Sequence, residues 1–372
     1  MKVRRYNYSA QFEMLSDLTD RLQKMLLSGQ YILTKEVEDF EISFAQYIGV
    51  EHVRGVNCGT DALILALRVL GIGVGDEVIT QANTFHATVA AIALTGATPV
   101  LTDADEHSYL MNDDQIASAV THRTRALVPV HLYGKPTPMA RMLEIARKND
   151  VAVIEDAAQA HGAKLDGKRM GSVGLLGCFS FHPSKNLAAA GDGGAVATND
   201  ARLADGLGRQ RSLGQAGQNH HVAVGYNTKL DAIQAQILQW KLSKLDEWNE
   251  SRGRIAAWYR ERLRELPISF QSTSAQELHV YHLFAVRTDR RDELLAHFQR
   301  LGVDAVVRYP TPIPLQPAFA DYGWKAGQFP VAEKLAQELL CLPIRPDMTV
   351  QEVDYVADCA RSFFRGTPSG EG

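Results

Sequence analysis

The stretch FSFHPSKNLAAAGDGGAVATND (residues 179–200) places Lys185 between an apolar segment and a run of glycines. A phosphate-binding P-loop needs its glycines before the lysine and a Ser or Thr directly after it. Here Asn186 follows the lysine, the glycines come later, and no G-x-G-x-x-G dinucleotide pattern occurs. This order disfavours a kinase or a dehydrogenase. It favours a loop that exposes one amine for covalent chemistry, with the later glycines turning the backbone tightly into a strand.

Outward from this loop, short apolar segments alternate with helical patterns. Segments 77–80, 125–133 and 151–157 are typical of strands, and helical patterns such as 87–94 separate them. The alternation predicts an α/β fold whose mostly parallel sheet is covered by helices on both faces. Asp156 ends one of these strands, at the edge where open α/β sheets bind ligands.

The pattern changes after residue 195, and a long helical segment spans 230–266. We interpret this segment as the connection into a second unit with mixed helical and strand-like stretches. The sequence therefore predicts a large domain over residues 1–245 and a smaller C-terminal α+β domain over residues 246–372. The end of the chain is small, polar and rich in Gly and Pro, so we expect about the last eight residues to be disordered.

Net charge, cysteine spacing and the lack of long apolar segments exclude several classes of function. The chain has 372 residues and a formal net charge of -4, which favours neither nucleic acid nor an anionic membrane as a partner. Its four cysteines have no C-x-x-C spacing, so we expect no metal centre and a reducing cytoplasm as the location. The N-terminus lacks the apolar core of a signal peptide, and no segment is apolar enough to span a membrane.

A lysine amine can form a Schiff base with the carbonyl cofactor pyridoxal 5′-phosphate (PLP), but such a site needs further parts. It needs a carboxylate beside the pyridine nitrogen, and Asp156 is a candidate. It needs phosphate donors at a helix start, which Gly59 and Thr60 could supply. Phe85 could stack on the ring, and Ser180 lies just before the lysine loop. Each of these alone is equally typical of a helix cap, a loop or a core residue; their order along one chain favours the PLP interpretation.

With these residues in place, the chain resembles the DegT/DnrJ/EryC1/StrS family of PLP-dependent sugar aminotransferases from about Gln30 to about Phe364. The motifs that carry the resemblance are NCGTDALILAL, GDEVITQANTFHAT, HLYGKP, VIEDAAQAHGA, FSFHPSKNLAAAGDGGAVATND, VGYNTKLDAIQAQIL, HVYHLFAVR and RYPTPIPLQPAF. The resemblance implies an aspartate aminotransferase-like fold of type I.

The resemblance also implies roles for individual residues. Lys185 matches the Schiff-base lysine, and Asp156 matches the partner of the pyridine nitrogen. The other implied cofactor contacts are Gln159 near the ring hydroxyl, Phe85 on the ring face, and Gly59, Thr60 and Ser180 at the phosphate. Asn227 matches a phosphate contact that the neighbouring subunit supplies, which implies a homodimer with shared active sites.

The implied reaction moves the amino group of L-glutamate to a keto sugar carried on a nucleoside diphosphate. Many family members that aminate C4 have a glutamate six residues after the lysine, whereas here Asp192 comes seven residues after it. This form resembles the members that aminate C3, such as those acting on dTDP-3-keto-6-deoxyhexoses. The alternatives are a 4-keto-sugar or cyclitol aminotransferase of the same fold, or a non-enzymatic sensor or regulator.

Substrate contacts are expected from four residues near these motifs: His182, Lys229, Arg308 and Tyr309. Two of them depart from the family pattern, since Lys229 stands where arginine is usual and Arg308 stands where histidine is common. Lysine cannot bind a carboxylate or a phosphate with the planar fork of arginine. The sugar, the nucleotide and the amino donor therefore stay open at this stage.

Overall fold

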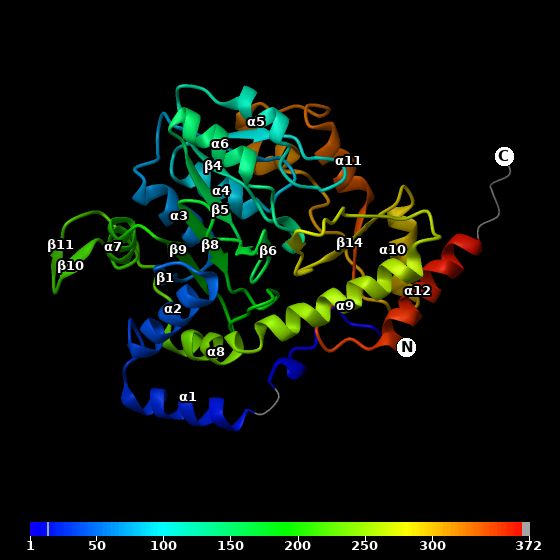
Figure 1. Cartoon of the computed structure of the whole chain (residues 1–372), viewed down its shortest axis with the longest axis horizontal. Coiled ribbons are helices and arrows are strands. Elements are labelled where there is room, and N and C mark those ends of the chain that lie inside the picture. The colour runs from blue at the N-terminus through cyan, green and yellow to red at the C-terminus, as the bar shows by residue number, and fades with distance from the viewer. Residues whose placement is uncertain (13–14, 367–372) are drawn as a thin grey trace.

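The computed structural model describes residues 1–12 and 15–366, so most of the tail that we expect to be disordered lies outside the described residues. At its centre is a seven-stranded sheet with helices around it, as Figure 1 shows. Its order is β1 (His52–Val56), β9 (Gly194–Thr198), β8 (Leu176–Ser180), β5 (Ala152–Asp156), β4 (Thr124–Val128), β2 (Glu77–Gln81) and β3 (Thr98–Thr102). Strand β9 is antiparallel to both neighbours and the other adjacent pairs are parallel, which confirms the mostly parallel sheet.

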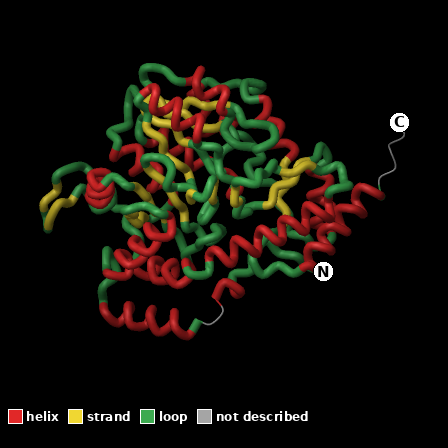
Figure 2. The backbone as a smooth tube through the Cα atoms, viewed as in Figure 1, coloured by secondary structure: helices red, strands yellow, loops and turns green. Residues whose placement is uncertain are grey.

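Successive side chains of a strand point to opposite faces of the sheet, and both faces are buried because helices cover them. Val78 packs in one core group with α3 (Gly59–Val69), whereas its neighbour Ile79 packs in another group with α6 (Ala140–Asn149). Phe179 joins a third group built on the aromatic face of α2 (Lys35–Ile48). Figure 2 shows the resulting layers of helices around the strands. The other helices of this part are α1 (Ser16–Ser28), α4 (His86–Leu94), α5 (Asp113–Ala119), α7 (Ala201–Gln210) and α8 (Ala232–Leu242).

A second core lies at the C-terminal end of the chain. It packs α9 (Leu245–Leu263), α10 (Arg291–Arg300) and α12 (Val350–Arg365) around a small sheet in the order β12, β14, β15. Val3, at the start of the chain, is buried in this same core. Figure 1 shows α9 running from beside α8 toward α10 and α12, so this helix links the two cores. The domain boundary at residue 245 stays a prediction.

Shorter elements complete the described residues. The small C-terminal sheet consists of β12 (Ser269–Phe270), β14 (Phe284–Arg287) and β15 (Leu339–Leu342), and α11 (Pro330–Glu338) directly precedes its last strand. Two further small sheets are formed by β6 (Lys164–Leu165), β7 (Lys168–Arg169) and β13 (Glu277–Leu278), and by β10 (Gln215–Gly217) and β11 (His220–His221). The last pair forms a hairpin that projects beside α7 in Figure 1.

Two elements differ from the sequence-based expectation. The strand expected over 125–133 ends at Val128 because Pro129 has no N–H to continue the ladder, although its carbonyl still accepts from the N–H of Asp156 over 2.9 Å. The long helix expected over 230–266 is two helices, α8 and α9, separated at Ser243 and Lys244. Because α8 and α9 are separate helices, α9 can run in its own direction toward the second core.

Candidate active site

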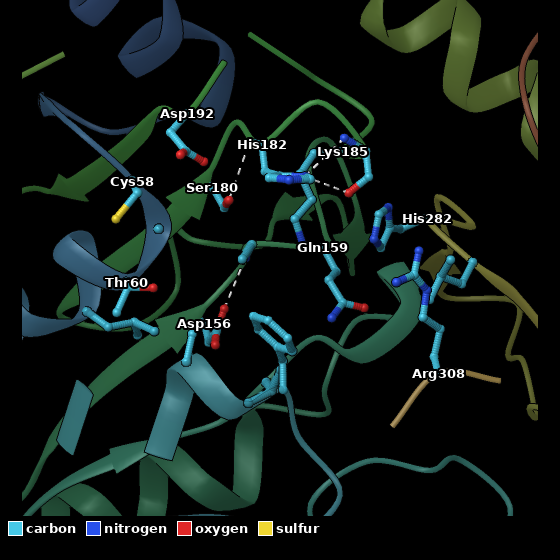
Figure 3. Close-up of a pocket in the computed structure, with 18 of the residues that line it drawn as sticks. Cys58, Thr60, Asp156, Gln159, Ser180, His182, Lys185, Asp192, His282 and Arg308 are labelled. Carbon is cyan, nitrogen blue, oxygen red and sulfur yellow. Dashed lines mark hydrogen bonds between the residues drawn. The ribbon is translucent and has the colours of Figure 1, made fainter. Parts of the chain in front are cut away.

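The residues expected to form a site meet at the carboxyl ends of β5 and β8, around a cavity of about 430 Å³. Figure 3 shows Asp156, Ser180 and Lys185 converging on this cavity from different elements. Ten of the twelve predicted site residues line it: Gly59, Thr60, Phe85, Asp156, Gln159, Ser180, His182, Lys185, Arg308 and Tyr309. Asn227 and Lys229 are the two that do not.

The loop that carries Lys185 is closed by its own backbone. The N–H of Phe181 donates to Gly193 O over 2.7 Å, and the N–H of Ala189 donates to Phe181 O over 2.8 Å. Asn186, the residue after the lysine, is buried and donates through its side-chain amide to Asn249 Oδ1 and Val280 O. Since the residues on either side are tied down, the loop holds the Lys185 amine at the cavity.

Lys185 and Asp156 form the electrostatic centre of the cavity. Burial lowers the pKa of Lys185 to about 8, an effect that Asp156 partly opposes and the Arg308 cation adds to. Burial raises the pKa of Asp156, while hydrogen bonds from the Thr88 hydroxyl (2.8 Å) and the Ala158 N–H (3.2 Å) lower it. The result is an amine that loses its proton more readily than an ordinary lysine, next to a carboxylate held in one orientation.

The N-terminus of α3 provides a cradle for an anion. The first N–H groups of a helix have no intrahelical acceptor, and here they belong to Gly59 and Thr60. Cys58 caps the helix by accepting from the N–H of Asp61 over 3.4 Å. A Cβ on Gly59 would lie 2.5 Å from the Cβ of Ser180, so only glycine allows the helix start to approach the end of β8 this closely.

An amide and two aromatic rings, those of Phe85 and Tyr309, form another wall of the cavity, and the buried Tyr133 ring stacks on Tyr309. Gln159 accepts from the N–H of Tyr133 over 2.8 Å and donates to the hydroxyl of Tyr309 over 2.9 Å. The Tyr309 ring lies 5.9 Å from that of Phe85 and 6.2 Å from that of Tyr133. Phe85 is 51% exposed, an unusual fraction for a large apolar ring that lines a cavity. This exposed ring suits a flat ligand.

Two site residues escaped the sequence-based reasoning. Thr88, on α4, donates a hydrogen bond to Asp156; it ends the motif GDEVITQANTFHAT in the first helical turn after Phe85, but the motif alone gave it no contact. His282 lines the cavity, is only 7% exposed, and its Nδ1 has no hydrogen-bond partner among the described residues. Burial, together with nearby cations such as Lys185, holds the pKa of His282 well below its usual value, so the ring is neutral.

Asn227 and Lys229 lie on a loop that passes the start of α3 without facing the cavity. Their neighbour Thr228 is buried, accepts from the N–H of Asn57 over 3.2 Å and donates to Asp61. The side chain of Asn227 is exposed and accepts a hydrogen bond from Lys229. Within one chain, therefore, Asn227 has no contact with the cavity, and its expected role in a neighbouring subunit stays a prediction.

Comparisons with known proteins identify the family. The sequence model that describes the DegT/DnrJ/EryC1/StrS aminotransferase family matches residues 13–361 of this chain. The chain is 43% identical over 356 residues to the dTDP-3-amino-3,4,6-trideoxy-alpha-D-glucose transaminase of Streptomyces venezuelae, covering 95% of this chain and 94% of that protein. The crystal structure of S. venezuelae DesV in complex with a ketimine intermediate matches with a TM-score of 0.95 and 42% identity, over 97% of this chain and 98% of that one.

A more distant structure, that of ntda from Bacillus subtilis with bound cofactor pmp, matches with a TM-score of 0.91 and 29% identity, covering 98% of this chain and 85% of that one. The chain belongs to the DegT/DnrJ/EryC1/StrS aminotransferase family, as the motifs indicated. It is an aminotransferase with the expected fold. Among the described residues, no helix is long and apolar enough to cross a membrane, and no group of His, Cys, Asp or Glu side chains could hold a metal ion.

Proposed function

We propose that this chain is a PLP-dependent aminotransferase that moves the amino group of L-glutamate to C3 of a nucleoside-diphosphate keto-deoxysugar, such as a dTDP-3-keto-6-deoxyhexose. The observation that carries the proposal is the pairing of Lys185, an amine with a lowered pKa, with the buried Asp156 in one cavity at the strand ends. Perturbed groups of opposite sign that face a cavity are typical of catalytic sites.

The cavity fits pyridoxal 5′-phosphate. The N–H groups of Gly59 and Thr60, with the Ser180 hydroxyl, would bind the phosphate, and Phe85 would cover the ring. Asp156 would pair with the ring nitrogen, and Gln159 would lie near the ring hydroxyl. When bound, the cofactor supplies an electron sink for the reacting carbon. The pocket's polar groups thus match the cofactor's phosphate and pyridine nitrogen.

Lys185 would serve both as the attachment point and as the group that moves protons. An amine with a pKa of about 8 is neutral in about one molecule in ten at pH 7, so it can accept a proton from the carbon beside the donor nitrogen and return it elsewhere. Asp156 keeps its carboxylate oriented through Thr88 and the Ala158 N–H. Neutral His282 leaves Lys185 as the stronger base in this part of the cavity.

The choice of C3 rests on Asp192, which lines the same cavity as Lys185, and on the name of the S. venezuelae relative. The sharing of sites between two subunits rests on Asn227, whose exposed side chain would reach the phosphate of a neighbouring copy. A homodimer would also give Lys229 access to a substrate. Among the described residues, the side chains of Asn227 and Lys229 bond to each other, and neither residue lines the cavity of its own chain.

The test is a pair of half-reactions. The protein incubated with PLP should turn yellow, lose this absorbance on addition of L-glutamate, and regain it on addition of a dTDP-3-keto-6-deoxyhexose. Lys185→Ala should lack the wild-type absorbance and the turnover. A matched 4-keto sugar nucleotide and a cyclitol ketone complete the panel. Regain of absorbance only with one of these ketones would contradict the C3 assignment, and no reaction with any amino acid would favour a sensor or regulator.

A further inference from the structure

Arg308 faces the catalytic cavity without a counter-ion. Its Nη2 donates to the hydroxyl of Tyr6 over 2.9 Å, and its Nε is buried without a hydrogen-bond partner. Among the described residues no carboxylate forms an ion pair with it, although Asp156 and Asp192 line the same cavity. Arg308 is half-buried, and because no carboxylate cancels the charge of its guanidinium, that charge is available to an incoming anion.

The hydrogen-bond partner of Arg308 is a phenol hydroxyl, which does not cancel the charge of the guanidinium. A carboxylate partner would orient the guanidinium and also cancel its charge. The Tyr6 hydroxyl accepts one hydrogen bond, which orients the guanidinium but leaves the charge and the remaining N–H groups for a ligand. Tyr6 is therefore suited to position Arg308 without competing for the anion.

Tyr6 reaches Arg308 because the first residues of the chain are tied to the C-terminal core. Val3 is fully buried, donates its N–H to Gly302 O over 3.0 Å, and accepts from the N–H of Asp304 over 2.9 Å. The Tyr6 ring is stacked on that of Tyr8 at 5.5 Å, with an angle of 9° between the planes. Residues 3–8, which we call the N-terminal arm, thus place the Tyr6 hydroxyl beside Arg308.

We propose that Arg308, positioned by Tyr6 of the N-terminal arm, binds the α-carboxylate of the amino donor; this inference rests on the proposed aminotransferase function. The donor must bring its amino nitrogen to the place that the Lys185 amine occupies. Its α-carboxylate is attached to the same carbon as that nitrogen, so it stays in the cavity that Lys185, His282 and Arg308 line together. The diphosphate of a sugar nucleotide is held farther from the reacting carbon by the sugar ring.

His282 completes this subsite. Figure 3 shows it between Lys185 and Arg308. Its buried, neutral ring has one donor and one acceptor nitrogen, and Nδ1 is buried without a hydrogen-bond partner among the described residues. A neutral ring beside the guanidinium could donate one hydrogen bond to a carboxylate oxygen. It would add this bond without adding a second charge.

The first experiment measures the donor half-reaction of the PLP-loaded protein at increasing donor concentration, followed by its visible absorbance. Arg308→Gln should raise the half-saturating concentration of L-glutamate about 10- to 100-fold, the usual effect of losing a hydrogen bond to a charged group, and change the limiting rate much less. L-Glutamine should show the same rise, because it keeps the α-carboxylate and lacks the distal one. Arg308→Lys should fall between the two proteins, since it keeps the charge without the fork.

The second experiment separates positioning from folding. Tyr6→Phe keeps the ring stack and removes the hydroxyl, and it should raise the half-saturating donor concentration about 3- to 10-fold. Tyr8→Phe is the matched control from the same arm, because its hydroxyl makes no hydrogen bond within the described part of the chain. It should leave both the half-saturating concentration and the thermal unfolding midpoint unchanged.

Other outcomes overturn the inference. An unchanged donor dependence in Arg308→Gln, or a rise for L-glutamate alone, would remove the α-carboxylate from Arg308. A weakened half-reaction with the aminated nucleotide sugar, combined with a normal donor half-reaction, would assign Arg308 to the diphosphate instead. If the wild-type protein reacts with no amino acid at all, the proposed function fails, and this result is distinct from a wild-type reaction that Arg308→Gln leaves intact.

Discussion

Gly59→Ala tests the packing that builds the anion cradle. The added Cβ would lie 2.5 Å from Ser180 Cβ, 3.1 Å from its Oγ and 3.2 Å from its Cα. Carbon atoms in contact need about 3.5–4.0 Å, so the start of α3 must move away from β8 by about 1 Å. Overpacking of this kind costs about 1–3 kcal/mol of the free energy of unfolding. The same movement carries the N–H groups of Gly59 and Thr60 away from a bound phosphate.

Two measurements follow for this variant. Denaturant unfolding of the cofactor-free protein gives the stability loss, and titration with PLP gives the affinity, where about 1.4 kcal/mol corresponds to a tenfold change. The double variant Gly59→Ala with Ser180→Gly removes the atom that the new Cβ meets, so it should recover most of the stability that Gly59→Ala loses. Gly253→Ala, inside α9 with open space around the new Cβ, is the control and should stabilise the protein by about 0.5–1 kcal/mol.

If Gly59→Ala is as stable as the wild-type protein and binds PLP equally well, close packing of Gly59 against Ser180 does not build the anion cradle. If adding Ser180→Gly recovers no stability, the nearest contact is not the cause of the loss. Ser180→Ala, which keeps the Cβ and removes the hydroxyl, separates the loss of a phosphate donor from the loss of space.

Three further outcomes can be measured. Because only the neutral amine of Lys185 attacks the cofactor and its pKa is lowered to about 8, the rate of PLP uptake in stopped-flow absorbance should rise about tenfold per pH unit below pH 8 and level off above it; a midpoint near that of an ordinary lysine would contradict this. Asp156→Asn should lower turnover by about 10²-fold or more while changing PLP affinity far less, and unchanged turnover would exclude its role at the ring nitrogen. Lys135→Met should cost about 3–5 kcal/mol in denaturant unfolding by leaving the buried Glu277 side chain, 2.5 Å from the lysine amine, without a cation. The double variant Lys135→Met with Glu277→Leu should recover most of this loss, and no recovery would mean that the ion pair is not the cause.

Local patterns in the sequence, taken in their order along the chain, predicted the centre of the site. Asp156 could be placed because it ends an apolar strand of a sheet whose carboxyl edge binds ligands, and Lys185 because the residues beside it exclude a P-loop. Gly59 and Thr60 could be predicted as phosphate donors because they open a helix. In each case the chemistry depends on the residue type and on its position relative to one strand or helix, and both can be read from neighbouring residues.

The tertiary structure decided the contacts that join segments far apart in the chain. Tyr6 reaches Arg308, Thr88 reaches Asp156, and His282 enters the cavity only because separate elements pack together. Thr88 and His282 lie within motifs of the family resemblance, but a motif does not tell which distant residue a side chain meets, because such contacts arise from the packing of separate elements. The sequence by itself thus determined the fold class and predicted Lys185 as the reactive amine. The groups that change the pKa of that amine, such as Asp156 and Arg308, are brought to it by long-range packing. This packing depends on the shapes of all the buried side chains at once.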